Sequence, residues 1–200
     1  MTNKEKFLSL LRTVKRDGVE NLISWLETTD FFEAPASTRF HESFEGGLLQ
    51  HSLSVYYSLY RLNQDLNLNL NGESIIVTAL LHDLCKVNFY KTATRNVKVN
   101  GKWETAPYYT IDEKMNYGGH GSKSVFIAQS FIHLSYVEAS AINCHMGVTN
   151  NDYSVFDCYR KNCLAFFLHV ADMMSTCEWY NDKNVESNSQ VVSSRSRDVQ

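Results

Sequence analysis

The chain has 200 residues, of which 44% are hydrophobic and 20% are charged, and its formal net charge is −3. These values are typical of one globular domain with a single core, and the absence of a basic excess argues against binding to duplex nucleic acid. The N-terminus has no apolar signal segment and no apolar run reaches transmembrane length, so no membrane association is expected. The five cysteines show no CxxC pair, which favours free thiols and a cytoplasmic protein.

The N-terminal half has mostly helical apolar periodicity. Helices are predicted over residues 4–16, 19–29, about 47–65 and 73–87, and the last is mostly apolar and hence buried. A turn-rich connection containing Pro35 and the pair Gly46-Gly47 precedes the third helix.

The period then changes. Residues 96–105, "NVKVNGKWET", alternate around Asn100-Gly101, the residue pair favoured by a two-residue type I′ turn, so a small β-hairpin is predicted around residues 96–111. A glycine loop at 115–119 enters another helix. A further helix begins with a capping box, Ser135 to Glu138, and stops at Gly147.

The last long helix is predicted over 163–180, and the polar, serine-rich segment 183–200 is predicted to be disordered. The fold class is therefore all-α, with a hairpin excursion. We expect a single domain over 1–182, with its core at about 28–180 and the N-terminal helices packed on that core.

Several imidazoles and carboxylates occur in otherwise apolar or glycine-rich settings, where an unpaired charge would be costly. They are His51, His82, Asp83, His120, His145 and Asp172. A metal ion is a partner that satisfies imidazole and carboxylate groups together.

The dipeptide His82-Asp83 lies near the end of the apolar helix 73–87. On that helix Lys86 would point roughly between the two side chains, so an ammonium would lie beside a metal held there. The two oxygens of Asp83 could bridge two metals about 3.5–4 Å apart, the separation used in two-metal hydrolysis.

The order H…HD…H…H…D, with "HDLCK" at its centre, resembles the HD superfamily of metal-dependent phosphohydrolases. The segments "GGLLQHS", "ALLHDLCKV", "GGHGSKSV", "INCHMG" and "HVADMMS" fall where that superfamily places ligands. The likeness covers about residues 28–180 and is greatest to short single-domain HD proteins of phages and gut bacteria. The stretch "FHESFEGGLLQHS" is also similar to the HD portion of bacterial 3′–5′ exoribonucleases.

The resemblance implies an HD-type helical bundle with one metal on His51, His82, Asp83 and Asp172. It also implies a second metal on His120 and His145, with Asp83 bridging. The cofactor would be one or two divalent transition-metal ions, chosen among Mn, Fe, Co, Ni and Zn.

Four other residues, Lys86, Arg39, His41 and Tyr108, have two open interpretations each, and Lys123 is a further candidate. Lys86 either contacts phosphate or caps its helix. Arg39 and His41 either orient substrate or metal ligands, or are solvated loop residues. Tyr108 either stacks on a base or packs a strand face, and Lys123 in "GGHGSKS" is a candidate for substrate contact.

The remaining histidines, His133 and His169, are interpreted as structural, because no ligand of the family falls on their segments.

We therefore predict a phosphohydrolase that cleaves a phosphate ester or anhydride of a small nucleotide with metal-activated water. Asp83 and Lys86 are its catalytic candidates. One alternative is a 3′–5′ exonuclease or phosphodiesterase on short single-stranded nucleic acid, and another is a non-catalytic nucleotide-binding sensor. The expected partner is a small nucleotide or another phosphorylated substrate, and a homodimer is possible.

Overall fold

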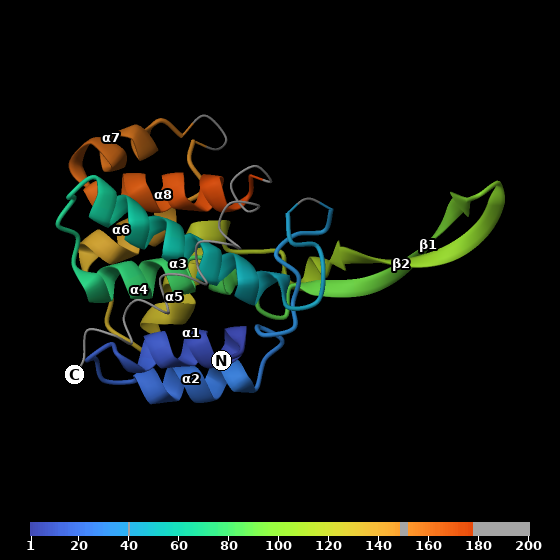
Figure 1. Ribbon diagram of the computed structural model, residues 1–200, viewed down its shortest axis with the longest axis horizontal. Coiled ribbons are helices and arrows are strands. Elements are labelled where there is room, and N and C mark those ends of the chain that lie inside the picture. The colour runs from blue at the N-terminus through green and yellow to red at the C-terminus, as the bar shows by residue number, and fades with distance from the viewer. Residues whose placement is uncertain (40, 149–151, 178–200) are drawn as a thin grey trace.

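The computed structural model describes residues 1–39, 41–148 and 152–177. Over these residues it is a helical body from which one β-hairpin projects (Figure 1). The eight α-helices of the described residues are α1 (Asn3–Arg12), α2 (Val19–Glu27), α3 (Gly47–Asp65), α4 (Gly72–Leu81), α5 (His120–Gln129), α6 (Tyr136–Cys144), α7 (Ser154–Lys161) and α8 (Cys163–Ser175). The mostly helical fold with a small hairpin is thus confirmed, whereas the segment 183–200 lies outside the described residues.

Helix α4 ends at Leu81, so the prediction of a helix continuing to residue 87 is wrong at its C-terminal end. The Nδ1 atom of His82 donates to the carbonyl of Ala79 (2.8 Å), and Asp83 has φ −108° and ψ 21°, outside the helical region. A single 3-10 turn, Leu84–Lys86, follows. The chain therefore leaves the helical conformation at His82 and Asp83, the two adjacent ligand candidates.

Other predicted helix ends also shift. Helix α1 ends at Arg12 and not at residue 16, and α2 ends at Glu27 and not at residue 29. Helix α8 ends at Ser175, within the predicted range, and the predicted positions 178–180 lie outside the described residues. Helix α7 is a short addition that the apolar pattern did not indicate, because only Val155 of its eight residues is buried.

Helix α3 occupies the centre of the body, where it packs against α4 and α8 and also contacts α1. Its two faces bury apolar side chains in two clusters, one shared with α1, α2 and α4 and the other with α8. Each fully buried leucine or phenylalanine contributes roughly 1.5–3 kcal/mol to folding. The central helix is therefore the rigid element from which site residues can project.

Helices α5 and α6 approach each other closely at Gly121. A Cβ atom at this position would lie 2.3 Å from the carbonyl oxygen of Asn143, which no real side chain tolerates. The close contact brings the start of α5, where His120 lies, beside the end of α6, where His145 lies.

The hairpin consists of β1 (Tyr90–Val99) and β2 (Lys102–Ile111), paired antiparallel from Tyr90↔Ile111 to Val99↔Lys102. Asn100 and Gly101 have φ of 50° and 84°, so the predicted type I′ turn is confirmed. The hairpin begins six residues before the predicted position 96, because pairing continues down to its base. There the hydroxyl of Tyr90 donates to the carbonyl of Ala36 (3.1 Å).

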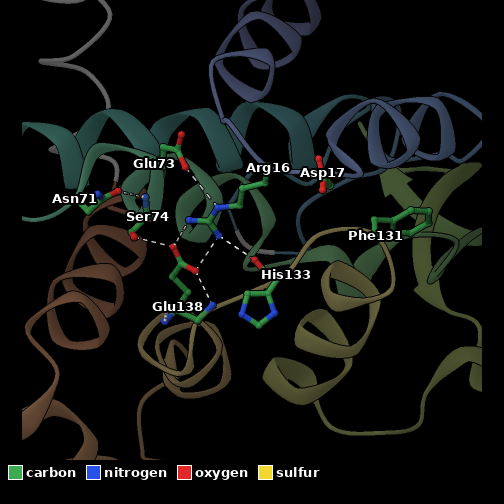
Figure 2. A pocket seen from close by; sticks show the side chains of 9 residues that line it. Arg16, Asp17, Asn71, Glu73, Ser74, Phe131, His133 and Glu138 are labelled. Carbon is green, nitrogen blue, oxygen red and sulfur yellow. Dashed lines mark hydrogen bonds and ion pairs between the residues drawn. The ribbon is translucent and has the colours of Figure 1, made fainter.

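A buried ion pair joins the start of the chain to the body (Figure 2). The Glu138 carboxylate, 1% exposed, accepts two hydrogen bonds from the Arg16 guanidinium (2.6 and 2.9 Å) and one from Ser74 Oγ (2.7 Å). It also accepts from the backbone N–H of Ser135, which confirms the predicted capping box. Although burial raises the pKa of Glu138, the bonds from Arg16 and Ser74 outweigh that effect and lower the pKa to about 2.

None of the described helices combines the length and apolar character that crossing a bilayer would require.

We predict that Glu138→Gln lowers the free energy of unfolding by about 1 to 3 kcal/mol at pH 7, because it removes two charged hydrogen bonds from the partly buried Arg16 guanidinium and leaves it Glu73 as its remaining acidic partner. The folded-state pKa of about 2 lies below the ordinary 4.5, so the carboxylate stabilises the fold above pH 4.5 and this contribution is lost as the pH falls towards 2. Urea denaturation at pH 7 and pH 3 should therefore show a smaller difference between wild type and variant at pH 3.

The matched control is Glu20→Gln, which removes an exposed carboxylate paired with Arg12 on the surface. We expect it to change the free energy of unfolding by less than about 0.5 kcal/mol. An equal effect of the two substitutions would contradict a specific role of the buried pair.

Candidate metal centre

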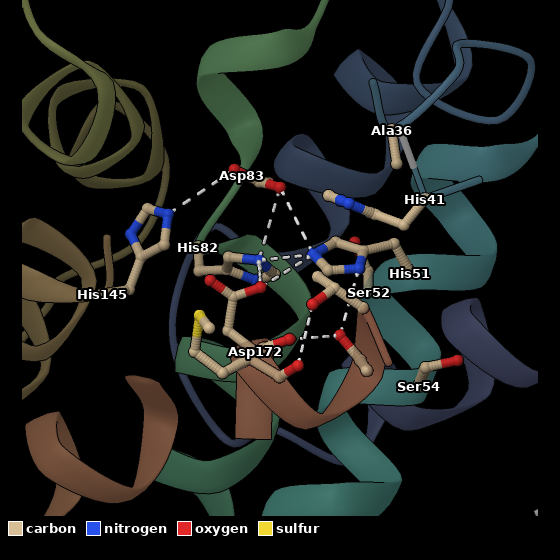
Figure 3. A network of polar contacts seen from close by, with 12 residues as sticks. Ala36, His41, His51, Ser52, Ser54, His82, Asp83, His145 and Asp172 are labelled. Carbon is tan, nitrogen blue, oxygen red and sulfur yellow. Dashed lines mark hydrogen bonds and ion pairs between the residues drawn. The ribbon is translucent and has the colours of Figure 1, made fainter. Parts of the chain in front are cut away.

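The six side chains predicted as metal ligands come together at one place, although they arise from separate elements. Figure 3 shows five of them, and His120 contacts Asp83 from α5. His51 lies in the second turn of α3, Asp172 lies in α8, and His120 is the first residue of α5. His82 and His145 cap the C-termini of α4 and α6, and Asp83 follows His82 directly.

Four of these side chains form a first group, in which His51 and His82 lie near both the Oδ2 atom of Asp83 and the Oδ1 atom of Asp172. The Nε2 atom of His51 lies 3.6 Å from Asp83 Oδ2 and 3.1 Å from Asp172 Oδ1. The Nε2 atom of His82 lies 3.4 Å from Asp83 Oδ2 and 3.9 Å from Asp172 Oδ1. The two Nε2 atoms are 3.2 Å apart. Four potential donor atoms thus surround one small volume.

The other oxygen of Asp83 faces a second group. The Nε2 atom of His120 lies 2.8 Å from Asp83 Oδ1, and that of His145 lies 3.6 Å from it. The Asp83 carboxylate therefore lies between two pairs of histidines, with one oxygen directed towards each pair.

Backbone carbonyls fix the tautomers of two of these rings. Nδ1 of His82 lies 2.8 Å from the carbonyl oxygen of Ala79, and Nδ1 of His145 lies 2.6 Å from that of Ile142. Because a carbonyl oxygen only accepts, each Nδ1 must carry the proton, which leaves the lone pair of Nε2 directed at the site. A histidine at the C-terminal end of a helix can thus bond to the backbone through Nδ1 and direct its Nε2 atom at the site.

These atoms fit divalent transition metals. Ligand atoms about 2.0–2.2 Å from a shared ion lie roughly 3–3.5 Å from one another, close to the separations observed in the first group. The Nε2 atom of His145 is buried and forms no hydrogen bond with the described residues, so a metal would supply the partner that it lacks. Mixed imidazole and carboxylate donors suit Mn, Fe, Co, Ni or Zn.

The charges around Asp83 keep it ionised. Its carboxylate is 2% exposed, and the Lys86 ammonium lies 2.6 Å from Oδ2. Although burial raises the pKa of Asp83, the positive charge of Lys86 and the neighbouring histidines hold it well below its usual value. Lys86 is only 8% exposed, and its ammonium forms an ion pair with the Asp83 carboxylate.

His51 has different electrostatics from its neighbour. Burial lowers the pKa of both His51 and His82, but the neighbouring carboxylates of Asp172 and Glu42 outweigh burial at His51 and raise its pKa to about 9. A metal bound through Nε2 of His51 would therefore displace a proton at neutral pH.

Glu42 is a residue that sequence reasoning missed. Its Oε2 atom lies 3.2 Å from Nδ1 of His51, on the side of the ring opposite to Asp172, and the Oγ atom of Ser175 lies 3.2 Å from the same nitrogen. Glu42 Oε2 is buried and forms no hydrogen bond with the described residues, so its contact with His51 is one of charge. A carboxylate next to Nδ1 favours the proton on that nitrogen and thereby helps to orient a metal-ligating histidine. The only sequence signal for this role is the position of Glu42 in the connection before Gly46-Gly47, which is too general to single it out.

The substrate-contact candidates fall in two different pockets. Lys123 lines a pocket of about 240 Å³ together with His120, whose side chain is 32% exposed and is the most accessible of the six. Arg39 and Tyr108 line a separate pocket of about 460 Å³ at the hairpin base. His41 is not among the residues that line either pocket, and its ring centroid lies 5.0 Å from that of His51.

The two remaining histidines are not in the cluster. His169 Nδ1 donates to the carbonyl of His145 (2.6 Å), which supports the backbone next to a ligand candidate. His133 is exposed and lines the pocket of about 720 Å³ beside Arg16 and Glu138, where no candidate ligand lies (Figure 2).

Comparison with known proteins agrees with the site. Residues 48–176 match the family described as HD domain, and because this is well over half of the chain, the protein belongs to that family. A curated relative is the dihydroneopterin 2′,3′-cyclic phosphate phosphodiesterase of Methanocaldococcus jannaschii, 40% identical over 58 residues. That match spans 27% of this chain and only 23% of the relative. No solved structure was found to match the chain.

We predict that Glu42→Gln weakens Mn²⁺ binding about 10-fold, because it removes the negative charge next to Nδ1 of His51 and leaves the orientation of this ring less constrained. Isothermal titration calorimetry of the metal-free full chain would measure the dissociation constant. Glu45→Gln, an exposed acid three residues further along, is the matched control and should bind Mn²⁺ as the wild type does. Unchanged affinity in Glu42→Gln would contradict this role.

Proposed function

We propose that the protein is a metal-dependent phosphohydrolase that cleaves a phosphoric ester bond. The observation that carries the proposal is the Asp83 carboxylate, whose two oxygens face two separate pairs of histidines. Membership of the HD domain family and the partial likeness to a phosphodiesterase support the same reaction class.

In this proposal His51, His82, Asp83 and Asp172 would hold a first metal ion. His120 and His145 would hold a second, together with Asp83. Divalent ions in such sites would supply the nucleophile, because they lower the pKa of a coordinated water molecule to about 7.

The chain's own residues account for orientation and charge. Lys86 holds Asp83 Oδ2 at 2.6 Å, which keeps the carboxylate ionised and fixes its direction. Its ammonium also adds positive charge where the phosphate would develop negative charge. His51, His82, Asp83 and His145 are buried, which restricts the access of bulk water to them.

The phosphate would approach from the side of His120, the most exposed of the candidate ligands. The pocket there, about 240 Å³, also contains Lys123, whose Nζ donates to the carbonyl of Met115 (2.9 Å) and lies over the rings of Phe89 and Tyr117. Lys123 is thus held in place as a cation at the entrance, in keeping with a phosphate ligand.

We propose that the substrate is either a small nucleotide or, as for a 3′–5′ exonuclease or phosphodiesterase, a short single-stranded nucleic acid. The basic pocket at the hairpin base favours the second of these. A non-catalytic nucleotide sensor would bind the same ligands without turnover.

We predict that the Mn²⁺-loaded protein hydrolyses bis(4-nitrophenyl) phosphate and releases product from at least one member of a panel of nucleotides and dinucleotides. Asp83→Asn should lower kcat at least about 100-fold, because it removes the charge shared by both histidine pairs. Asp65→Asn, at the exposed end of α3, should retain wild-type activity. Nucleotide binding without turnover by the wild type would favour the sensor, and full activity of Asp83→Asn would contradict the assignment.

A further inference from the structure

A second concave surface lies outside the metal centre, between the connection before α3 and the base of the hairpin. Figure 1 shows this connection beside the point from which the hairpin leaves the helical body. The pocket there has a volume of about 460 Å³, and its lining includes Arg39, Ser43, Arg95, Tyr108 and Tyr109. None of these residues belongs to the candidate ligand set.

The hairpin is basic although the chain as a whole is acidic. Residues 90–111 contain four basic residues and one acidic residue, which gives the hairpin a net charge of +3. Since the whole chain has a net charge of −3, the remaining residues together carry −6. The basic residues are Lys91, Arg95, Lys98 and Lys102. A projecting arm of this charge attracts polyanions to one part of an otherwise acidic protein.

Two guanidinium groups in the pocket have no acidic partner within the described part of the chain. Arg39 and Arg95 are exposed, and neither forms an ion pair with a described carboxylate. The guanidinium of Arg95 lies over the ring of Tyr108, 5.3 Å from its centroid. A planar guanidinium group can form two parallel hydrogen bonds to one phosphate, which is bidentate binding. An arginine that stacks on an aromatic ring is held in position to do so.

Aromatic rings complete the chemistry of the pocket. Tyr108 and Tyr109 are adjacent in β2, so they point to opposite faces of the strand, and both line the pocket. Nucleobases stack on tyrosine rings without regard to base identity. Rings next to unpaired guanidinium groups therefore fit a nucleotide unit, with the base on a tyrosine and the phosphate on an arginine.

The same connection links this pocket to the metal centre. Arg39 and Ser43 lie two residues on either side of His41, whose ring centroid is 5.0 Å from that of His51. The hairpin is attached to the connection by the hydrogen bond from Tyr90 to Ala36. A ligand in the pocket would thus lie next to the segment that also carries Glu42, the partner of His51.

We propose that this pocket binds a nucleotide that is not the one cleaved, so that the substrate is a short single-stranded oligonucleotide, with a dinucleotide as the smallest. The inference rests on the proposed hydrolysis at the metal centre and names its substrate class. One phosphate lies at the metals while a neighbouring phosphate and base occupy the pocket.

The test measures binding of a fluorescein-labelled tetrathymidylate with phosphorothioate linkages, which slow its hydrolysis, to the metal-loaded full chain by fluorescence anisotropy. Arg39→Ala/Arg95→Ala should raise the dissociation constant at least about 10-fold. It should also lower the slope of log Kd against log salt concentration by roughly 0.7 for each lost phosphate contact. Tyr108→Leu should weaken binding, and Tyr108→Phe should restore it.

The matched control is Lys98→Ala/Lys102→Ala, which removes the same charge from exposed positions of the hairpin outside the pocket. Because these lysines add only to the general attraction of the arm and do not line the pocket, it should change the dissociation constant less than about 3-fold. Equal losses in the two double variants, or no loss in Arg39→Ala/Arg95→Ala, would overturn the proposal. So would thymidine monophosphate competing as well as a 5′-phosphorylated dithymidylate.

Hydrolysis of bis(4-nitrophenyl) phosphate by the wild type separates the two proposals. If the wild type turns over this substrate but Arg39→Ala/Arg95→Ala binds the oligonucleotide as tightly as the wild type, the proposed pocket is wrong and the proposed hydrolysis stands. Specific binding through Arg39 and Arg95 without turnover of any phosphodiester defeats the proposed hydrolysis and, with it, the claim that the bound oligonucleotide is a substrate.

Discussion

The structure depends on one buried carboxylate that is shared by two pairs of histidines. Asp83 is 2% exposed, and its oxygens face His51 and His82 on one side and His120 and His145 on the other. Such a group is tolerated in a protein interior only with charged or hydrogen-bonding partners on every side. The ammonium of Lys86 is one such partner, and metal ions held by the histidines would be the others.

The fold supplies these partners largely from the ends of helices. His82 and His145 cap α4 and α6, and their Nδ1 atoms bond to carbonyls three residues earlier. His120 starts α5, where the contact at Gly121 brings it to the end of α6. Helix ends leave backbone groups without intrahelical partners, so they can orient a side chain at no cost to the helix interior. The site thus forms where several elements begin or stop, on a body held together by α3 and α8.

Local signals in the sequence predicted local structure well. Helix α3 has the predicted bounds, Asn100-Gly101 forms the predicted turn, and Ser135 to Glu138 forms the predicted capping box. The end of α4 was predicted wrongly, because the apolar pattern continues past Leu81 while the hydrogen bond of the His82 ring ends the helix. The lower part of the hairpin lacks the alternation seen near its turn, so its start at Tyr90 was not evident.

The order of histidines and aspartates predicted the family, which the match over residues 48–176 confirms, and it supplied the six ligand candidates. Glu42 could not be found in this way, because its contact with His51 depends on how the connection folds back over α3. The pocket formed by Arg39, Arg95 and Tyr108 likewise depends on tertiary contact between two segments about 50 residues apart.

The most direct test of the shared Asp83 carboxylate is the metal content of the protein, measured by inductively coupled plasma mass spectrometry after loading with Mn²⁺ and removal of free ions. A centre with two histidine pairs predicts a ratio near two metal ions per chain for the wild type and near one for His120→Ala/His145→Ala. A wild-type ratio near one that those substitutions leave unchanged would contradict the account.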